Sequence, residues 1–162
     1  MTYEILKYPA KELETATNEV EEVTDDIVEK IDRMVETMYQ NKGIGLAANQ
    51  VGLKESIIVF DCSDADDEPQ CLINPKISSG NGSIVIEEGC LSFPGVTVHV
   101  NRFKTIVVEY MDLNGDSLKK VFKDLESICV QHEIDHLEGK TFFSRINRQS
   151  RRKALKEMRR SR

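Results

Sequence analysis

The chain is organised around Gln131-His132-Glu133-Ile134-Asp135-His136-Leu137-Glu138-Gly139. If this stretch is helical, His132 and His136 stand one turn apart on the same face, where their imidazoles can hold a single divalent ion. Glu133 then lies beside that ion and can accept or return protons. The stretch therefore predicts a metal site with a carboxylate next to it. The alternative is a pair of core histidines bonded to backbone carbonyls.

The flanking residues indicate that this helix is buried on two sides. Asp124 is placed to cap its N-terminus, Glu126 lies in the first turn and Gly139 suits the C-terminal stop, so we expect a helix over residues 125–138. Its apolar residues form two stripes at helical spacing, which are Leu125, Ile128 and Cys129, and Val130, Ile134 and Leu137. Because such a helix lies inside a domain, both histidines point into protein, where an unpaired imidazole is costly.

The rest of the chain predicts an α+β fold. We expect a helix over residues 25–40 with Thr24 as its cap, and a basic helix over 148–160. Short apolar runs between them predict strands, at residues 55–60, 71–74, 83–86, 96–100, 106–111 and 117–122. Predicted turns lie at Tyr8-Pro9, Gly80-Asn81-Gly82 and residues 112–116, and Phe142 and Phe143 are expected to close the core. Many short strands before a buried helix indicate antiparallel sheets packed around it.

Length and composition favour a single globular domain. The chain has 162 residues, of which 40% are hydrophobic, and no run approaches the roughly 18 apolar residues of a membrane span. The N-terminus lacks the basic-then-apolar order of a secretion signal. The four cysteines, Cys62, Cys71, Cys90 and Cys129, form no CxxC pair, which fits a reducing compartment. We therefore expect a cytoplasmic protein, with an organellar or phage-encoded origin as alternatives.

The charge is divided unevenly along the chain. From Lys140 onward there are ten Lys and Arg residues against the single acidic residue Glu157, a net charge of +9, so the preceding residues carry −15 of the overall −6. An acidic body with a basic tail predicts contact with a polyanion through the tail, and RNA is the obvious candidate in a cytosol. The alternative is a solvated terminal helix whose charges only aid solubility.

A metal bound by two histidines needs a further protein ligand. The candidates are Cys90, Cys129, His99 or a carboxylate. Cys129 shares the histidine stripe, but the ion would lie about 7.5 Å further along the helix axis, beyond its reach. His99 alternates with valines on a strand and is expected on the wetter face. Cys90 lies where a strand breaks at Gly89, so the turn can expose its thiol; a buried, inert cysteine is the alternative reading.

Three segments, residues 43–50, 87–92 and 131–139, together resemble the signature motifs of the peptide deformylases. The resemblance implies removal of the formyl group from the N-terminal formylmethionine of new polypeptides. It implies Cys90, His132 and His136 as metal ligands, with Fe²⁺ as the usual metal and Zn²⁺, Ni²⁺ or Co²⁺ as substitutes. It also implies Glu133 as the acid/base and Gln50 with the Leu91 backbone amide as oxyanion donors. On its own, the 43–50 segment also fits a plain helix C-cap and turn.

The resemblance also suggests how the substrate is held. The methionine pocket and backbone contacts would come from Ile44, Gly45, Ile86, Glu88, Gly89, Leu125, Ile128 and Cys129, for several of which ordinary core packing is the alternative. Glu88 is further expected to pair with Arg102. Thr97 departs from the arginine that several bacterial members carry near this position, which affects contacts beyond methionine.

The resemblance makes residues 1–147 a single catalytic domain and residues 148–162 an appended basic helix. The tail is shorter than in members whose C-terminal helix docks on the ribosome, but its basic charge predicts contact with the ribosome or its RNA. We expect a monomer. Two other functions are alternatives: a zinc endopeptidase with a carboxylate as third ligand, and a non-enzymatic module that the metal only stabilises.

Overall fold

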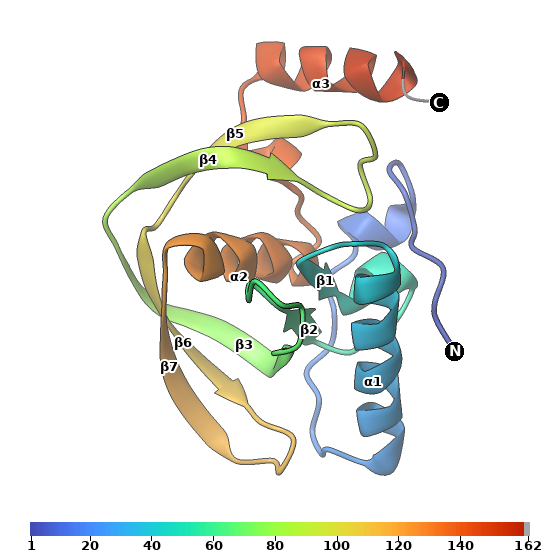
Figure 1. Cartoon of the computed structure of the whole chain (residues 1–162), viewed down its shortest axis with the longest axis vertical. Coiled ribbons are helices and arrows are strands. Elements are labelled where there is room, and N and C mark those ends of the chain that lie inside the picture. Colours follow the sequence, from blue (N-terminus) through green and yellow to red (C-terminus); the bar gives the residue numbers. More distant parts are fainter. Residues whose placement is uncertain (161–162) are drawn as a thin grey trace.

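Helix α2 (Asp124–Leu137) lies between two antiparallel sheets in the computed structural model, which describes residues 1–160 (Figure 1). One sheet has five strands in the order β1-β2-β3-β6-β7, and the other has β4 and β5. The strands are β1 (Gly45–Ala47), β2 (Ile57–Phe60), β3 (Gln70–Asn81), β4 (Ile84–Gly89), β5 (Thr97–Arg102), β6 (Thr105–Met111) and β7 (Ser117–Lys123). The other helices are α1 (Asp25–Gln40), α3 (Arg148–Arg160) and the short 3₁₀ turns η1 (Lys11–Glu14), η2 (Ala48–Val51) and η3 (Phe142–Arg145). The predicted α+β class is confirmed.

Helix α2 is buried on all sides from Ser127 onward, as its two apolar stripes predicted, but Leu125 in its first turn is 42% exposed. Every residue from Ser127 to Leu137 is buried, and Cys129, Val130, Ile134 and Leu137 pack in a core cluster with Ile58, Phe60 and Leu72 of the five-stranded sheet. Asp124 was predicted as the N-cap, and this is wrong: the helix begins at Asp124, after Lys123, which makes no side-chain cap. The chain enters the helix directly from β7, and the Asp124 amide instead donates to the Lys104 carbonyl at 2.9 Å.

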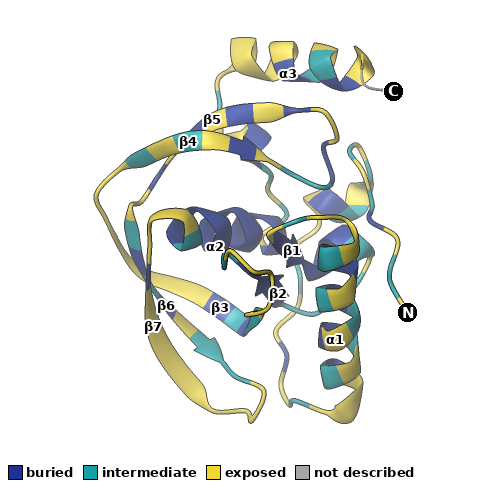
Figure 2. Ribbon diagram, viewed as in Figure 1, coloured by how far each residue is buried: buried dark blue, intermediate teal, exposed yellow. Residues whose placement is uncertain are grey.

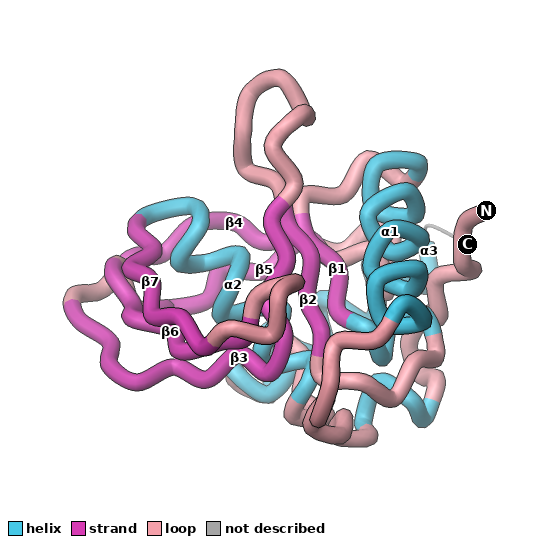
Figure 3. The backbone as a smooth tube through the Cα atoms, turned by 90° about the horizontal axis from the view of Figure 1, so that it is seen from below, coloured by secondary structure: helices cyan, strands magenta, loops and turns pink. Residues whose placement is uncertain are grey.

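Helix α1 covers the opposite end of the five-stranded sheet from β6 and β7 (Figure 3). The Thr24 side chain accepts a hydrogen bond from the Ile27 amide at 3.3 Å, so the predicted cap is confirmed. Its buried face packs against β1 and β2 in a separate core cluster that includes Ile31, Met34 and Met38. The bounds match the prediction because a single 3.6-residue stripe fixes this helix.

Strand β3 is longer than the sequence pattern suggested. Gly80 and Asn81 were predicted to form a turn, but both pair with β6, opposite Ile106 and Thr105. A Cβ built on Gly80 would lie 2.5 Å from Cδ2 of Phe103, so the glycine serves the close approach of that ring rather than a turn. The turn comes at Gly82, whose φ is +72°. The other predicted hairpin is confirmed, with β6 and β7 in register from Thr105↔Lys123 to Met111↔Ser117.

The two-stranded sheet and the C-terminal helix enclose a third core cluster. In β5 the valines at 98 and 100 are buried and His99 is exposed, as predicted. Phe142 and Phe143 are buried in the same cluster as Ala154 and Met158, the two buried residues of α3. The ribbon of α3 is otherwise mostly in the colour of exposed residues (Figure 2). Helix α3 therefore rests on β5 through one narrow face, and most of its surface is exposed.

Candidate active site

Cys90, His132 and His136 are brought together where β4 ends above α2. Their ligand atoms all lie within 4.8 Å of one another, and the Cys90 Sγ is 3.3 Å from Nε2 of His136. The two histidines are four residues apart on a helix, so their rings lie one turn apart and meet edge to face, with centroids separated by 5.0 Å. A thiolate and two imidazoles are a donor set that suits zinc or ferrous iron. Cys129 and His99 lie outside this group, as the sequence argument predicted.

His132 is oriented by a chain of buried charges. Its Nδ1 lies 3.0 Å from the carboxylate of Glu88, which accepts two hydrogen bonds from Arg102 at 2.6 and 2.9 Å. Arg102 also bonds Asp135 at 3.0 Å, and Asp135 pairs with Arg145 at the surface. Burial alone raises the pKa of Glu88, but the hydrogen bonds from His132 and Arg102 outweigh it and leave that pKa below its ordinary value. An ionised Glu88 holds Nδ1–H and leaves Nε2 of His132 for a metal.

His136 is the most deeply buried member of the group. It is fully inaccessible to solvent, and burial together with the charge of His132 lowers its pKa well below the usual range. Its backbone carbonyl accepts a hydrogen bond from the Asn49 side chain on η2, which fixes this turn of α2. A neutral imidazole with a free lone pair is the form of histidine that binds a metal.

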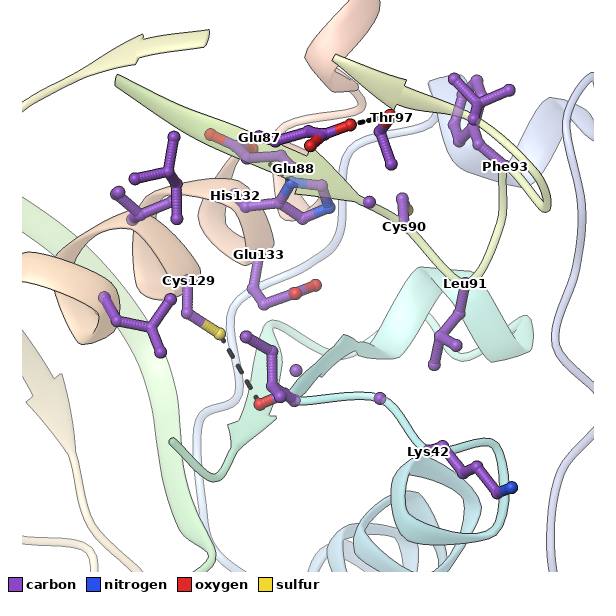
Figure 4. Close-up of a pocket in the computed structure, with 18 of the residues that line it drawn as sticks. Lys42, Glu87, Glu88, Cys90, Leu91, Phe93, Thr97, Cys129, His132 and Glu133 are labelled. Atoms are coloured by element: carbon purple, nitrogen blue, oxygen red, sulfur yellow. Dashed lines mark hydrogen bonds and ion pairs between the residues drawn. The ribbon is translucent and has the colours of Figure 1, made fainter. Parts of the chain in front are cut away.

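We call Cys90, His132 and His136 the metal group. Glu133 points into the space below it, beneath His132 and Cys90 in Figure 4. It is 4% exposed, and its Oε1 is buried with no hydrogen-bond partner among the described residues. Burial raises its pKa to about 7, although the charges of His132 and Arg102 oppose the rise. Gly45 makes room for it, since a Cβ there would lie 2.5 Å from Oε2. An unpaired carboxyl that titrates near neutrality is suited to moving protons.

Gln50 is held against the metal group by a fixed set of contacts. Its Oε1 accepts from the Ala47 amide at 2.9 Å, while Nε2 donates to Ser92 Oγ at 3.1 Å and to Cys90 Sγ at 3.6 Å. The side chain is 1% exposed. The Gln50 side-chain amide is therefore held in one orientation and does not flip. Its N–H groups stay directed toward the side of the site where Cys90 and Leu91 lie.

A cavity of about 590 Å³ opens onto these groups. It is lined by every residue predicted for catalysis or substrate binding, which are Ile44, Gly45, Gln50, Ile86, Glu88, Gly89, Leu91, Leu125, Ile128, Cys129 and Glu133, and by Cys90 and His132. His136 lies behind the lining. The remaining lining residues had no individual role predicted from the sequence, apart from Thr97, and they are Lys42, Gly43, Glu87, Phe93, Gly95, Val96 and Thr97. Gly43 and Glu87 lie inside the segments 43–50 and 87–92, and the others lie within a few residues of those segments, which was the only signal for them.

The chain is similar to known proteins in both sequence and structure. A family model described as polypeptide deformylase matches residues 2–152. A peptide deformylase of Aquifex aeolicus is 39% identical over 160 residues, 97% of this chain and 95% of that protein. One of Buchnera aphidicola is 43% identical over 155 residues, with 96% and 93% covered. Among solved structures, a peptide deformylase from Legionella pneumophila has a TM-score of 0.93 at 33% identity, covering 99% of this chain and 95% of that one. One from Synechococcus elongatus, in complex with actinonin, has a TM-score of 0.91 at 37% identity, with 96% and 86% covered.

Proposed function

Because the chain belongs to the polypeptide deformylase family, a family of hydrolases that remove the formyl group from new peptides, we propose that it does so with a metal ion held by Cys90, His132 and His136. The observation that carries the proposal is the convergence of one thiol and two imidazoles on a cavity that also holds an unpaired carboxyl. Fe²⁺ is the proposed metal, and Zn²⁺, Ni²⁺ or Co²⁺ are proposed substitutes, because thiolate and imidazole ligands accept all four. A divalent ion bound there supplies Lewis acidity and lowers the pKa of water toward neutrality.

Glu133 is the proposed acid and base. Its pKa near 7 means that it can take a proton from the attacking water and release it again at the same pH. The proton then goes to the amine that leaves when the bond to the formyl carbon breaks. Burial of the carboxyl keeps bulk water from competing for that proton.

Gln50 and the Leu91 backbone amide are the proposed donors to the oxygen that becomes negative as the formyl carbon is attacked. Gln50 is preorganised by Ala47 and Ser92, so little reorganisation is needed during the reaction. Leu91 follows Cys90 directly and lines the same cavity. Each donor of this kind contributes on the order of 3 kcal/mol to transition-state stabilisation.

The substrate is proposed to lie between β4 and the segment that precedes β1. Strand β4 pairs only with β5 among the described strands, so its other edge is open to a peptide backbone, and residues 86–89 line the cavity along it. The methionine side chain is assigned to the apolar wall formed by Ile44, Ile86, Leu125, Ile128 and Cys129, while Gly45 and Gly89 allow close approach of the backbone. Glu88 was predicted to bind substrate; because its carboxylate bonds His132 and Arg102, we propose that it acts through His132.

We further propose that residues 1–147 form the catalytic domain, that the chain acts as a monomer in the cytoplasm, and that the basic helix α3 contacts the ribosome or its RNA near emerging formyl-Met peptides. Helix α3 exposes Arg152, Lys153, Lys156 and Arg159, which supports a polyanion contact. No helix within residues 1–160 is long and apolar enough to cross a membrane.

The direct test is release of formate from a formyl-Met peptide by protein purified without oxygen and loaded with Fe²⁺. We expect turnover that is lost when the ion is chelated and restored by Fe²⁺ or Ni²⁺, with no release of acetate from the matched acetyl-Met peptide. Cleavage of internal peptide bonds without formate release would contradict the proposal and favour an endopeptidase. A fully loaded but inert protein would favour a purely structural ion.

A further inference from the structure

Two thiols meet at the wall of the active-site cavity. Cys129 Sγ donates a hydrogen bond to the Ile44 carbonyl at 3.6 Å, and the Asp61 amide donates to the same oxygen at 2.8 Å. Cys62 follows Asp61, and its side chain packs against the core cluster that contains Cys129. The two cysteines are 67 positions apart in the chain, and the Ile44 carbonyl binds both Cys129 and the residue that precedes Cys62.

The thiols are close enough to share a side-chain hydrogen bond. That bond lowers the pKa of Cys62, while it raises the pKa of Cys129, which burial raises further. Cys62 is only partly buried and lines a second cavity of about 360 Å³, together with Ser63, Glu68 and Lys123. Cys129 is buried and lines the active-site cavity. The pair therefore has one accessible, more reactive sulfur and one protected sulfur beside it.

We propose that Cys62 and Cys129 form an oxidation site at which a hydroperoxide converts the two thiols into a disulfide. In the first step the Cys62 sulfur attacks a peroxide oxygen, the O–O bond breaks, and the departing oxygen leaves as water or alcohol. In the second step the Cys129 sulfur attacks the sulfenic acid on Cys62, the S–S bond forms, and hydroxide leaves with the Cys129 proton as water. Two thiols lose two electrons in total, and one peroxide gains them.

This bond would alter the active site, because the Cys129 sulfur is packed against its centre. A Cβ built on Gly45 would lie 2.8 Å from Cys129 Sγ and 2.5 Å from Glu133 Oε2, so the sulfur and the carboxyl border the same small space. Drawing Sγ toward Cys62 withdraws part of the wall beside Glu133 and part of the apolar lining. The effect on turnover rests on the proposed function, whereas the disulfide itself does not.

The other cysteines are matched controls. Cys71 packs against the separate core cluster under α1, and burial raises its pKa to about 12, which makes it unreactive. Cys90 belongs to the metal group. Cys62 belongs neither to the metal group nor to the active-site cavity lining, and it contacts that lining through Cys129. Cys62→Ser keeps a hydroxyl at this contact, so we expect the reduced variant to turn over as the wild type does.

The experiment exposes the Zn²⁺-loaded full-length protein to hydrogen peroxide, since Zn²⁺ has no redox chemistry of its own. Cross-linked peptides are then mapped by mass spectrometry after digestion with trypsin and with a protease that cleaves before aspartate. The second enzyme is needed because Cys62 and Cys71 share one tryptic peptide, residues 55–76, and Asp64, Asp66 and Asp67 lie between them. Formate release is followed on the same samples before and after dithiothreitol.

We expect one cross-link, between Cys62 and Cys129, that dithiothreitol removes. In Cys62→Ser the Cys129 cross-link should fall about ten-fold or more, while in Cys71→Ser it should stay at the wild-type level. Peroxide should lower wild-type turnover reversibly and leave Cys62→Ser much less affected. Oxidation of Cys62 to sulfinic acid with no cross-link, or a cross-link that survives in Cys62→Ser, would overturn the proposal. An inactive enzyme that still forms the cross-link would refute the proposed function and leave this site standing.

Discussion

Helices α2 and α3 have almost the same length, 14 and 13 residues, but they are stabilised in opposite ways. Residues 127–137 of α2 are all buried, whereas in α3 only Ala154 and Met158 are. The charged groups within residues 127–137 of α2 face protein, and each requires a partner or a chemical role. Those of α3 mostly face solvent and need neither. The contrast teaches that a buried charge in this fold requires a partner or a chemical role, whereas an exposed charge is stable without either.

The largest effect of a single substitution in either helix is expected at Glu133 of α2. Glu133→Gln keeps the shape of the side chain but removes the proton acceptor, so we expect turnover to fall by about 10²–10⁴-fold with bound metal and melting temperature unchanged. Formate release and elemental analysis measure the two effects. The control is Glu138→Gln at the exposed end of the same helix, which should be silent. Retention of full turnover in Glu133→Gln would remove Glu133 from the mechanism.

The second test concerns the buried charges beside α2. Arg102→Met leaves Glu88 and Asp135 buried without their common partner, so we expect the free energy of unfolding to fall by about 3–5 kcal/mol. Urea titration measures the loss. Lys119→Met breaks an exposed pair with Glu109 and should cost less than about 1 kcal/mol. Equal losses in the two variants would mean that burial does not set the strength of these pairs.

Substitutions in the core under α3 should lower the free energy of unfolding less than loss of the buried charges does. They should lower it more than substitutions on the exposed face of α3. Met158 is 4% exposed in the cluster with Phe142 and Phe143, so Met158→Ala should cost about 2 kcal/mol, the lower end for a core methionine because the helix is terminal. Loss of helix signal at lower temperature in circular dichroism would show it. Lys153→Ala, on the exposed face, provides the baseline.

Asp61, a buried carboxylate outside the metal group, is expected to make the free energy of unfolding depend on pH. Asp61 is 1% exposed and accepts hydrogen bonds from Tyr39 at 2.5 Å and from the Ser63 amide at 2.8 Å. Burial alone raises its pKa, but the hydrogen bonds from Ser63 and Tyr39 leave the pKa below its ordinary value. The folded state therefore binds this proton less readily than the unfolded state, so Asp61 stabilises the fold above about pH 4 and the contribution is lost as pH falls through the folded-state pKa.

Tyr39→Phe tests that sign. We expect a loss of about 1–2 kcal/mol at pH 7, since one hydrogen bond to a charged group is removed. The difference from wild type should shrink as unfolding is measured at successively lower pH below 4. A difference that stays constant down to pH 3 would show that Tyr39 acts through packing alone.

The smallest effect on stability is expected on the outer face of α3. Arg152→Gln with Lys156→Gln should change the free energy of unfolding by less than about 0.5 kcal/mol and leave formate release on free peptides unchanged, because both side chains are exposed. Affinity for purified ribosomes should fall, and its dependence on salt should weaken. Ribosome binding that is unchanged and insensitive to salt would refute the proposed contact.

The helices were predictable from the sequence because each has a clear apolar period or, in α2, two. The three-residue strand β1 was not, because Gly45-Leu46-Ala47 has no alternation of its own and is a strand only through its pairing with β2. The Glu88–Arg102 pair was anticipated, but its extension to Asp135 and Arg145 was not, since the four residues come from four separate elements. The centre of the candidate site could be predicted because its residues lie in three recognisable sequence motifs. Lining residues such as Lys42 and Phe93 reach it through loops, for which local sequence carries no period.

The C-terminal end of α2 is held by the first part of the chain. The Thr17 amide and hydroxyl both donate to the Leu137 carbonyl, a contact between residues 120 positions apart, and a Cβ on Gly139 would lie 2.7 Å from the Glu14 carbonyl. During synthesis, the early segment has to wait for its partner until nearly the whole polypeptide has been made. Two histidines on a helix held in this way cannot be positioned by a partial chain, so nascent fragments should bind the proposed metal ion poorly.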